Sequence, residues 1–305
     1  MLMKTQALVF PGQGSQKIGM GRDLYDNFAV AKEVFAEVDD ALGCKLTDIM
    51  FDGQQEELNL TNNAQPAILA VSMAYFEVFK STGLIDEQNI KFAAGHSLGE
   101  YSALCAAGAL SLAEAARLLK LRGEYMMSAC RKEKGAMAAI IGWDLAKVRV
   151  LAEALGCYVA NSNSPAQIVI SGSEENITRA VEQAAAEGAK RAIRLSVSGA
   201  FHSPLMQSAA EAMGKVLPKA KIAEPKFKVI SNVTAKEYAD TNEIKHLLEE
   251  QITSTVKWQE SVGYMKECNV DEFVEVGFGN VLSGLIKKTV PDAAVLTSND
   301  LLNQL

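Results

Sequence analysis

The stretch KFAAGHSLGEYSALCAAGAL, residues 91–110, places a serine between two glycines, where an apolar run meets a run of small residues. Residues 92–96 are typical of a short buried strand, and residues 98–109 of a helix. The sequence GHSLG at 95–99 matches the G-x-S-x-G nucleophile elbow, a tight strand-to-helix turn that exposes the serine hydroxyl at the helix N-terminus. A helix-capping serine would also fit this position. The strand before it and the helix after it favour a nucleophilic Ser97.

The same strand–loop–helix order recurs on both sides of this turn. ALVF at 7–10 predicts a buried strand, and residues 23–42 and 66–79 carry apolar residues at helical spacing. Ser111, with Glu114 three positions on, is typical of a helix start. Such units predict a mostly parallel sheet covered by helices, in a large α/β-hydrolase-like domain.

Residues 132–200 have a different pattern. Their apolar runs and helical repeats follow the order strand, helix, strand, strand, helix, strand, which is typical of a ferredoxin-like βαββαβ unit. We therefore predict an α/β fold in two parts. Residues 1–131 and 201–305 form a discontinuous large domain, and residues 132–200 form a small inserted ferredoxin-like subdomain.

The composition argues against several classes of protein. The 305 residues carry a net charge of −7, so no wide basic surface is available to follow nucleic acid. No apolar run reaches the ~18 residues that a membrane span needs, and the one at the N-terminus is too short for a signal peptide. The five cysteines are scattered without metal-binding spacing. We expect a cytoplasmic, monomeric protein with reduced cysteines, no bound metal, and no affinity for nucleic acid or membranes.

A nucleophilic serine needs a base, and the chain has three histidines. His96 directly precedes Ser97, so its side chain is expected to point elsewhere on the turn. His246 lies in the polar run NEIKHLLEE, which is typical of a solvated surface. His202, in SGAFHSPLM, follows a predicted strand end in a loop bounded by Pro204. Elimination selects His202 as the base.

The order of these residues along the chain argues against an esterase. In α/β-hydrolases the order is serine, acid, histidine, and the histidine is expected near the C-terminus. Here about a hundred residues follow His202, and no aspartate stands in an obvious orienting loop between Ser97 and His202.

Arg122 is unusual because it lies in the middle of an apolar stripe that includes Leu118 and Met126, on the helix predicted for 112–127. A charge in such a place is costly unless it is paired. A buried ion pair with a distant protein carboxylate would satisfy it, as would a snorkelling side chain. A carboxylate on the ligand would satisfy it equally, because the planar guanidinium binds a carboxylate through two hydrogen bonds. The pattern alone leaves these readings open.

The glycine loop GQGSQ at 12–16 follows the first predicted strand. It is not a dinucleotide-binding fingerprint, because Lys17 replaces the last glycine of G-x-G-x-x-G, and it lacks the lysine spacing of a P-loop. A plain turn would explain the loop. A glycine-flanked amide at Gln13 would instead supply oxyanion-hole donors beside the elbow.

Taken together, these stretches resemble the malonyl-CoA:acyl carrier protein transacylases of fatty-acid synthesis and the related acyltransferase domains of polyketide synthases. The resemblance covers essentially the whole chain, in order. The matching stretches are FPGQGSQ at 10–16, TNNAQPAILA at 61–70, GHSLGEYSAL at 95–104, LRGEYM at 121–126, GAMAAIIG at 135–142, NSPAQIVISG at 163–172, GAFHSPLM at 199–206, SNVTA at 231–235, VKW at 256–258 and EVGFGNVLSGL at 275–285.

The resemblance implies a role for each candidate residue. Ser97 would carry the acyl group, His202 would act first as base and then as acid, and Arg122 would bind the malonyl carboxylate. Gln13 and the backbone N–H of Leu98 would form the oxyanion hole. The enzyme would be an acyltransferase.

Two further positions follow from the same resemblance. The backbone carbonyl of Gln251 would orient His202, which explains the missing acid. Phe201 would crowd an α-methyl group on the substrate and so favour malonyl, although core packing would explain this ring equally well.

The family mechanism is ping-pong and would need no cofactor. Malonyl-CoA is a substrate, and the phosphopantetheine arm belongs to the acyl carrier protein. Three alternatives stay open: a discrete polyketide synthase acyltransferase, a hydrolase that clears acyl carriers, and an inactive carrier-binding module. An acidic carrier would dock on a local basic patch, although solvated surface charges would look the same. The candidate patch residues are Lys190, Arg191, Arg194, Lys287 and Lys288.

Overall fold

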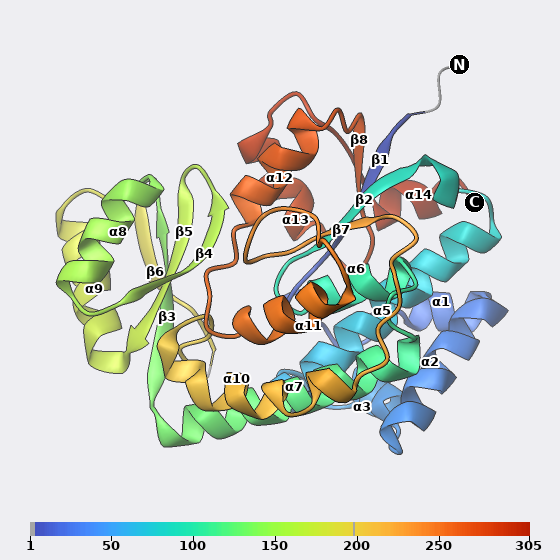
Figure 1. Ribbon diagram of the computed structural model, residues 1–305, viewed down its shortest axis with the longest axis horizontal. Helices are drawn as coiled ribbons and strands as arrows, with labels where there is room; N and C mark the ends of the chain where they lie inside the picture. Colours follow the sequence, from blue (N-terminus) through green and yellow to red (C-terminus); the bar gives the residue numbers. More distant parts are fainter. Residues whose placement is uncertain (1–3, 198) are drawn as a thin grey trace.

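The residues described in this computed structural model, 4–197 and 199–305, form two separate β-sheets (Figure 1). Sheet A is parallel throughout. Its strand order is β7 (Lys228–Ile230), β2 (Ile90–Gly95), β1 (Gln6–Phe10), β8 (Glu272–Glu275) and β9 (Ala294–Thr297). Sheet B is antiparallel. Its strand order is β4 (Tyr158–Ser164), β5 (Gln167–Ser173), β3 (Gly135–Ile141) and β6 (Arg191–Arg194).

Helices connect and cover these strands. The α-helices are α1 (Arg22–Asn27), α2 (Ala29–Leu42), α3 (Leu46–Asp52), α4 (Gln55–Leu58), α5 (Thr61–Ser81), α6 (Gly99–Ala106), α7 (Leu112–Lys132), α8 (Leu145–Ala154), α9 (Glu174–Ala186), α10 (Gln207–Gly214), α11 (Thr241–Glu250), α12 (Trp258–Glu267), α13 (Val281–Thr289) and α14 (Ser298–Leu302). The short 3₁₀ segments are η1 (Glu87–Asn89), η2 (Pro204–Met206) and η3 (Leu217–Lys219).

The central strands of sheet A, β2, β1 and β8, are mostly buried on both faces, as parallel sheets generally are. In β1, Leu8 and Phe10 pack into the core built with α2, α5, α6 and α7. The alternate residues Ala7 and Val9 pack on the opposite face, against α12 and α13. This period of two explains why ALVF reads as an uninterrupted apolar run.

Sheet B is covered on one face and faces the rest of the molecule with the other. Ala138 and Ile140 of β3 pack under α8 and α9, whereas Met137 and Ala139 join the core of the large body. The order β4-β5-β3-β6 is that of the ferredoxin-like βαββαβ unit. The predicted fold class, a mostly parallel α/β domain with this smaller antiparallel unit, is therefore confirmed. All four strands lie within 132–200 among the described residues, and the domain boundaries themselves stay a prediction.

Some predicted elements differ in extent. The helical pattern at 23–42 is divided into α1 and α2, because Phe28 adopts an extended conformation with φ −126°. The helix predicted at 66–79 begins earlier, at Thr61, and includes Pro66. The last strand of the predicted βαββαβ order is the short β6, which ends at Arg194.

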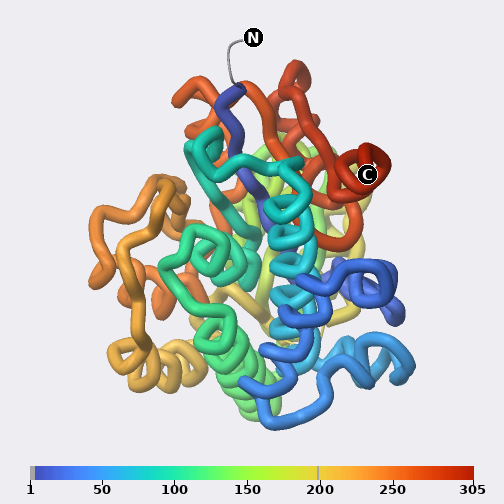
Figure 2. The backbone as a smooth tube through the Cα atoms, turned by 90° about the vertical axis from the view of Figure 1, so that its right-hand side faces the viewer, coloured from blue at the N-terminus to red at the C-terminus, as the bar shows by residue number. Residues whose placement is uncertain are grey.

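Helices α2, α5 and α7 pack along one another (Figure 2). A glycine permits a close approach of two of them: a Cβ on Gly123 of α7 would lie 2.5 Å from the Cα of Asn62 in α5. Because Gly123 follows Arg122, this contact brings the Arg122 side chain towards α5 and the end of sheet A.

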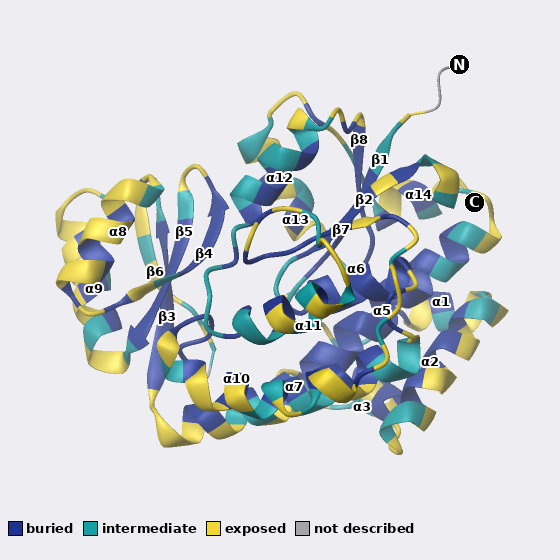
Figure 3. Cartoon of the chain, in the orientation of Figure 1, coloured by how far each residue is buried: buried dark blue, intermediate teal, exposed yellow. Residues whose placement is uncertain are grey.

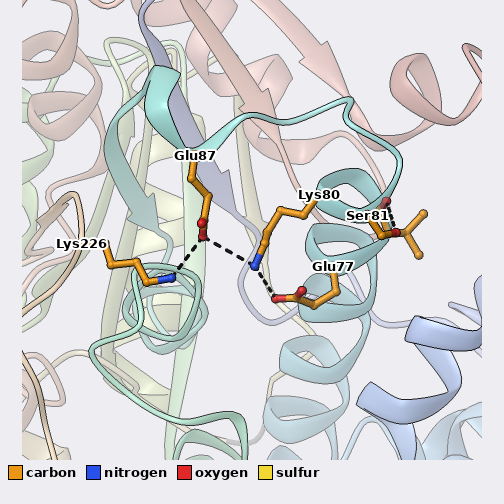
Figure 4. A network of polar contacts seen from close by, with 6 residues as sticks. Glu77, Lys80, Ser81, Glu87 and Lys226 are labelled. Carbon is orange, nitrogen blue, oxygen red and sulfur yellow. Dashed lines mark hydrogen bonds and ion pairs between the residues drawn. The ribbon is translucent and has the colours of Figure 1, made fainter.

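A network of charged side chains ties the start of β2 to its neighbours (Figure 4). Lys80 at the end of α5 lies 3.3 Å from Glu77 and 3.6 Å from Glu87 of η1. Lys226, ahead of β7, also reaches Glu87, at 3.5 Å. Each of these partly exposed ion pairs contributes modestly to the stability of the fold. Together they fix the segment from which β2 leads to the elbow.

Burial follows the layers of the fold (Figure 3). The strands of sheet A other than the edge strand β9 are mostly buried, as are most of α5 and α6, whereas α8 and α9 present exposed outer faces. Within the described residues, no helix is both long and apolar enough to span a membrane. The cysteines are free thiols, at positions 44, 105, 130, 157 and 268.

Candidate active site

Ser97 lies in a strained turn between β2 and α6. Its φ is +54°, in the left-handed region that side chains other than glycine rarely adopt. The flanking glycines make the turn possible. A Cβ on Gly95 would lie 1.8 Å from the backbone of Gly99, and one on Gly99 would lie 2.3 Å from the carbonyl oxygen of Phe10. The sequence pattern and the local geometry therefore agree on a nucleophile elbow at the carboxyl end of the sheet.

The backbone N–H groups of this turn are not all used. The Ser97 N–H donates to Asn232 Oδ1 at 2.7 Å, and Asn232 Nδ2 donates back to the Gly95 carbonyl at 2.7 Å. The Leu98 N–H, at the start of α6, has no hydrogen-bond partner among the described residues. It is thus free to donate to an oxyanion, which is the role that the family resemblance implies for it. Gln13 lines the cavity beside it.

Ser97 and His202 are in hydrogen-bond contact. The distance from Ser97 Oγ to His202 Nε2 is 2.8 Å, and His202 Nδ1 lies 2.9 Å from the Gln251 carbonyl oxygen. Since a carbonyl only accepts, Nδ1 carries the proton and Nε2 is left as the acceptor of the serine proton. His202 also has a positive φ, +55°, so both reacting side chains stand on strained backbone.

The environment keeps His202 neutral. The pKa of this imidazole is lowered to about 3, chiefly by burial and then by the nearby Arg122 charge, against the raising effect of the Gln251 carbonyl. A histidine that stays unprotonated near neutral pH is ready to accept a proton.

Arg122 reaches the same point from α7, although it is only 1% exposed. Its Nη1 donates to Gln65 Oε1 at 2.8 Å, and its Nη2 donates to Ser97 Oγ at 3.1 Å and to Gln251 Oε1 at 2.8 Å. Its Nε has no partner among the described residues. No carboxylate of the described chain forms an ion pair with this guanidinium, so the protein does not supply the direct counter-ion that a purely structural role would require.

A cavity of about 200 Å³ opens onto Ser97, His202 and Arg122. It adjoins a second cavity of about 230 Å³ that extends towards α13, and the two share lining residues. The shared residues are Gln13, Gly14, His96, Asn161 and Leu195. The two cavities therefore lie side by side, the first at Ser97 and the second against α13. A larger groove of about 470 Å³ touches His202 from another side but is lined by neither Ser97 nor Arg122.

The lining of the first cavity also includes apolar side chains. Phe201, Met126 and Met137 line it, and Phe201 is 6% exposed. A ring in this lining restricts the volume beside the reacting centre, which fits the specificity role predicted for Phe201. That role stays a prediction.

The other two histidines do not contact the Ser97 hydroxyl. His96 Nε2 is 2.8 Å from Asn163 Oδ1, so its ring points away from the serine hydroxyl. His246 has a 74% exposed side chain, 3.6 Å from Glu250. The structure thus brings together the predicted Ser97, His202 and Arg122, and places the Gln251 carbonyl behind them.

Three polar residues in this cluster were not singled out from the sequence: Gln65, Asn232 and Glu100. Gln65 is in TNNAQPAILA, Asn232 is in SNVTA, and Glu100 directly follows the elbow motif. All three are almost fully buried. An amide or carboxylate inside an apolar helix or strand end is the signal that would have indicated them.

Residues 7–304 match the acyl transferase domain family. The malonyl CoA-acyl carrier protein transacylase of Bacillus subtilis (strain 168) is 47% identical over 291 residues, which cover 94% of this chain and 90% of the relative. The solved acyl-carrier-protein-S-malonyltransferase of Bartonella henselae superposes with a TM-score of 0.94 at 46% identity, covering 98% of each chain. A malonyl-transacylase solved in complex with its type II polyketide synthase acyl carrier protein superposes with a TM-score of 0.93 at 39% identity, again over 98% of each chain.

Proposed function

The chain belongs to the acyl transferase domain family, and we propose that it transfers a malonyl group from malonyl-CoA to the phosphopantetheine thiol of acyl carrier protein. The observation that carries the proposal is a buried arginine, 3.1 Å from the hydroxyl of an elbow serine, that has no carboxylate partner in the described part of the chain. An acyl group that ends in a carboxylate fits this pair, because one end would meet Arg122 and the other Ser97.

The first half-reaction loads Ser97. His202 Nε2 takes the hydroxyl proton while Oγ attacks the thioester carbonyl, and the resulting oxyanion accepts hydrogen bonds from the Leu98 N–H and Gln13. The C–S bond then breaks, and His202 returns its proton to the departing CoA sulfur. The malonyl carboxylate stays on Arg122, where burial strengthens the charge-assisted hydrogen bonds.

The second half-reaction reverses these steps with a different thiol. The carrier's phosphopantetheine thiol gives its proton to His202 and attacks the malonyl-serine ester, the C–O bond breaks, and Ser97 Oγ regains a proton from His202. Water competes with this thiol. The burial of His202 and Arg122, 4% and 1% exposed, supports a site that limits such hydrolysis.

We place the carrier near the α13 end of the two cavities. The adjoining cavities extend from Ser97 past Asn161 towards α13, and Lys287 and Lys288 lie in the last turn of that helix. Lys190, Arg191 and Arg194, which are exposed on the edge of sheet B, complete the proposed acidic-carrier patch. We further propose that the protein is a cytoplasmic monomer, where its thiols stay reduced, and that serine and histidine suffice for the chemistry without a resident cofactor.

Product analysis tests the function. The protein is mixed with malonyl-CoA and acidic holo carrier protein, and malonyl-carrier, free malonate and free CoA are followed together. Transfer predicts malonyl-carrier and CoA in equal amounts. Free malonate as the main product would instead identify a hydrolase, and an unchanged mixture a carrier-binding module.

A further inference from the structure

The side chain of Gln251 has a fixed orientation in the site. Its Oε1 accepts from Arg122 Nη2 at 2.8 Å, and its Nε2 donates to the Ser97 carbonyl at 3.0 Å and to Glu100 Oε2 at 2.7 Å. Arginine can only donate, while a carbonyl and a carboxylate only accept. The carboxamide therefore fits in one orientation alone. The backbone carbonyl of the same residue holds His202.

Glu100 is the group that sets this orientation from behind. It is fully buried in the first turn of α6 and accepts from three donors: the Tyr238 hydroxyl, the Asn232 N–H at 3.0 Å and Gln251 Nε2. Burial raises the pKa of Glu100 to about 7, while these donors and the Arg122 charge act in the opposite direction. Above pH 8 it is therefore an ionised acceptor.

We propose that Glu100 is a positioning residue for carboxylate recognition: it fixes the Gln251 carboxamide, which in turn fixes the Arg122 guanidinium. This inference rests on the proposed function, because it gives a role to the carboxylate that Arg122 would bind. Glu100 contacts neither the substrate path nor the reacting atoms, so it acts only through Gln251 and Asn232.

The hydrogen-bond arithmetic of Arg122 explains why the positioning matters. A guanidinium has five N–H donors, and three of them are taken by Gln65, Gln251 and Ser97 Oγ. The remaining donors include the unpartnered Nε–H. A carboxylate bound through two hydrogen bonds requires the plane of this group to be fixed. If the carboxamide turned over, its NH₂ would face Arg122, and two donors would oppose each other.

The test measures the rate of serine acylation by malonyl-CoA and by acetyl-CoA, at pH 8.5, and takes their ratio. Glu100→Met removes the acceptor, and we expect the malonyl-to-acetyl ratio to fall ~10-fold or more, the usual scale for a buried donor left unpaired. Glu100→Gln keeps one oxygen for Gln251 and Asn232, so the ratio should fall less. Asp39→Asn is the matched control, since Asp39 is a buried carboxylate bonded to Thr47, remote from the site.

Coupling to Arg122 separates positioning from general destabilisation. In an Arg122→Ala background the ratio is already low, and adding Glu100→Met should lower it no further. If Glu100→Met does not fold, Gln251→Met decides the matter, because it keeps the backbone carbonyl and removes the carboxamide; its ratio should also fall ~10-fold.

Two outcomes overturn different claims. A folded Glu100→Met or Gln251→Met protein with the wild-type ratio, while Arg122→Ala collapses it, would overturn the positioning role alone. An Arg122→Ala protein that keeps the wild-type ratio would overturn the proposed carboxylate recognition itself.

Discussion

The large body and the small subdomain contribute different things to one cavity. The polar atoms around Ser97 Oγ come from the large body: His202, Arg122 and, behind them, Gln251. The subdomain contributes Met137, Asn161 and Leu195 to the lining. The reacting groups thus belong to the deeply buried large body, on strained backbone. The small antiparallel subdomain contributes to the lining of the cavity that leads to them.

The two parts also differ in where their charged side chains lie. The large body buries charged and polar groups such as Arg122 and Glu100, while the subdomain presents exposed basic residues along β6 and an exposed face on α8 and α9 (Figure 3). Buried charges in the large body should therefore affect chemistry and selectivity strongly. Surface charges on the subdomain should affect association, weakly and in a salt-dependent way.

The largest effect is expected at the elbow. Ser97→Ala removes the only oxygen that can carry the acyl group in this proposal and keeps the Cβ, so acylation should be lost completely while the fold is retained. Measured acylation with malonyl-CoA and thermal unfolding check both parts. Malonyl loading at the normal rate in folded Ser97→Ala protein would remove Ser97 as the nucleophile.

Arg122 comes next, because it separates substrate recognition from structure. In Arg122→Ala protein, malonyl-CoA loses a desolvated charge pair, and its acylation rate should fall on the order of 10²-fold. Acetyl-CoA has no carboxylate and should react no more slowly than before. Kinetics with both thioesters are measured beside the melting temperature. Equal losses with both thioesters, together with a large drop in stability, would indicate that Arg122 has a structural role instead.

The pKa of His202 gives a smaller but directional effect. It is lowered to about 3 in the fold, compared with about 6.5 in an unfolded chain. As pH falls below 6.5 the unfolded chain takes up this proton and the folded protein does not, so the stability associated with neutral His202 is lost between about pH 6.5 and 3. NMR of the imidazole, assigned with His202→Ala, should show no titration between pH 8 and 5. A midpoint near 6.5 would contradict the buried, neutral base.

The smallest effect is expected on the subdomain surface. Replacing Lys190 and Arg191 by glutamate should raise the apparent KM for acidic carrier protein several-fold at low salt, and leave the KM for malonyl-CoA unchanged. The same replacement at Lys32, which is exposed on α2, serves as the control. Carrier kinetics that match those of the control at low salt would exclude this patch as the docking surface.

The parts of the site that could be predicted are those that a short stretch of sequence is enough to identify. The elbow motif needs only Gly95, Ser97 and Gly99 within five positions. Arg122 can be recognised because it is a charged residue within an apolar helical stripe. The ferredoxin-like unit follows from one uninterrupted βαββαβ order. These signals need no knowledge of long-range contacts.

The supporting residues could not be predicted in this way, because their partners are remote. Gln65 and Arg122 are 57 positions apart, and Glu100 bonds to a residue 132 positions later. Periodicity identifies such residues as helix or strand members and says nothing of what their side chains will meet. Only the packing of α5 against α7, and of the loop after β7 against the elbow, brings them together.

The central claim is a two-step transfer through Ser97, and one single-turnover measurement tests it most directly. The protein is mixed with malonyl-CoA without carrier, digested, and the modified peptide is identified by mass spectrometry; a second sample receives holo carrier protein before digestion. The account predicts a malonyl adduct on Ser97 in the first sample, and its transfer to the carrier in the second. Malonyl-carrier formed while Ser97 is never modified, or an adduct on another residue, would contradict it.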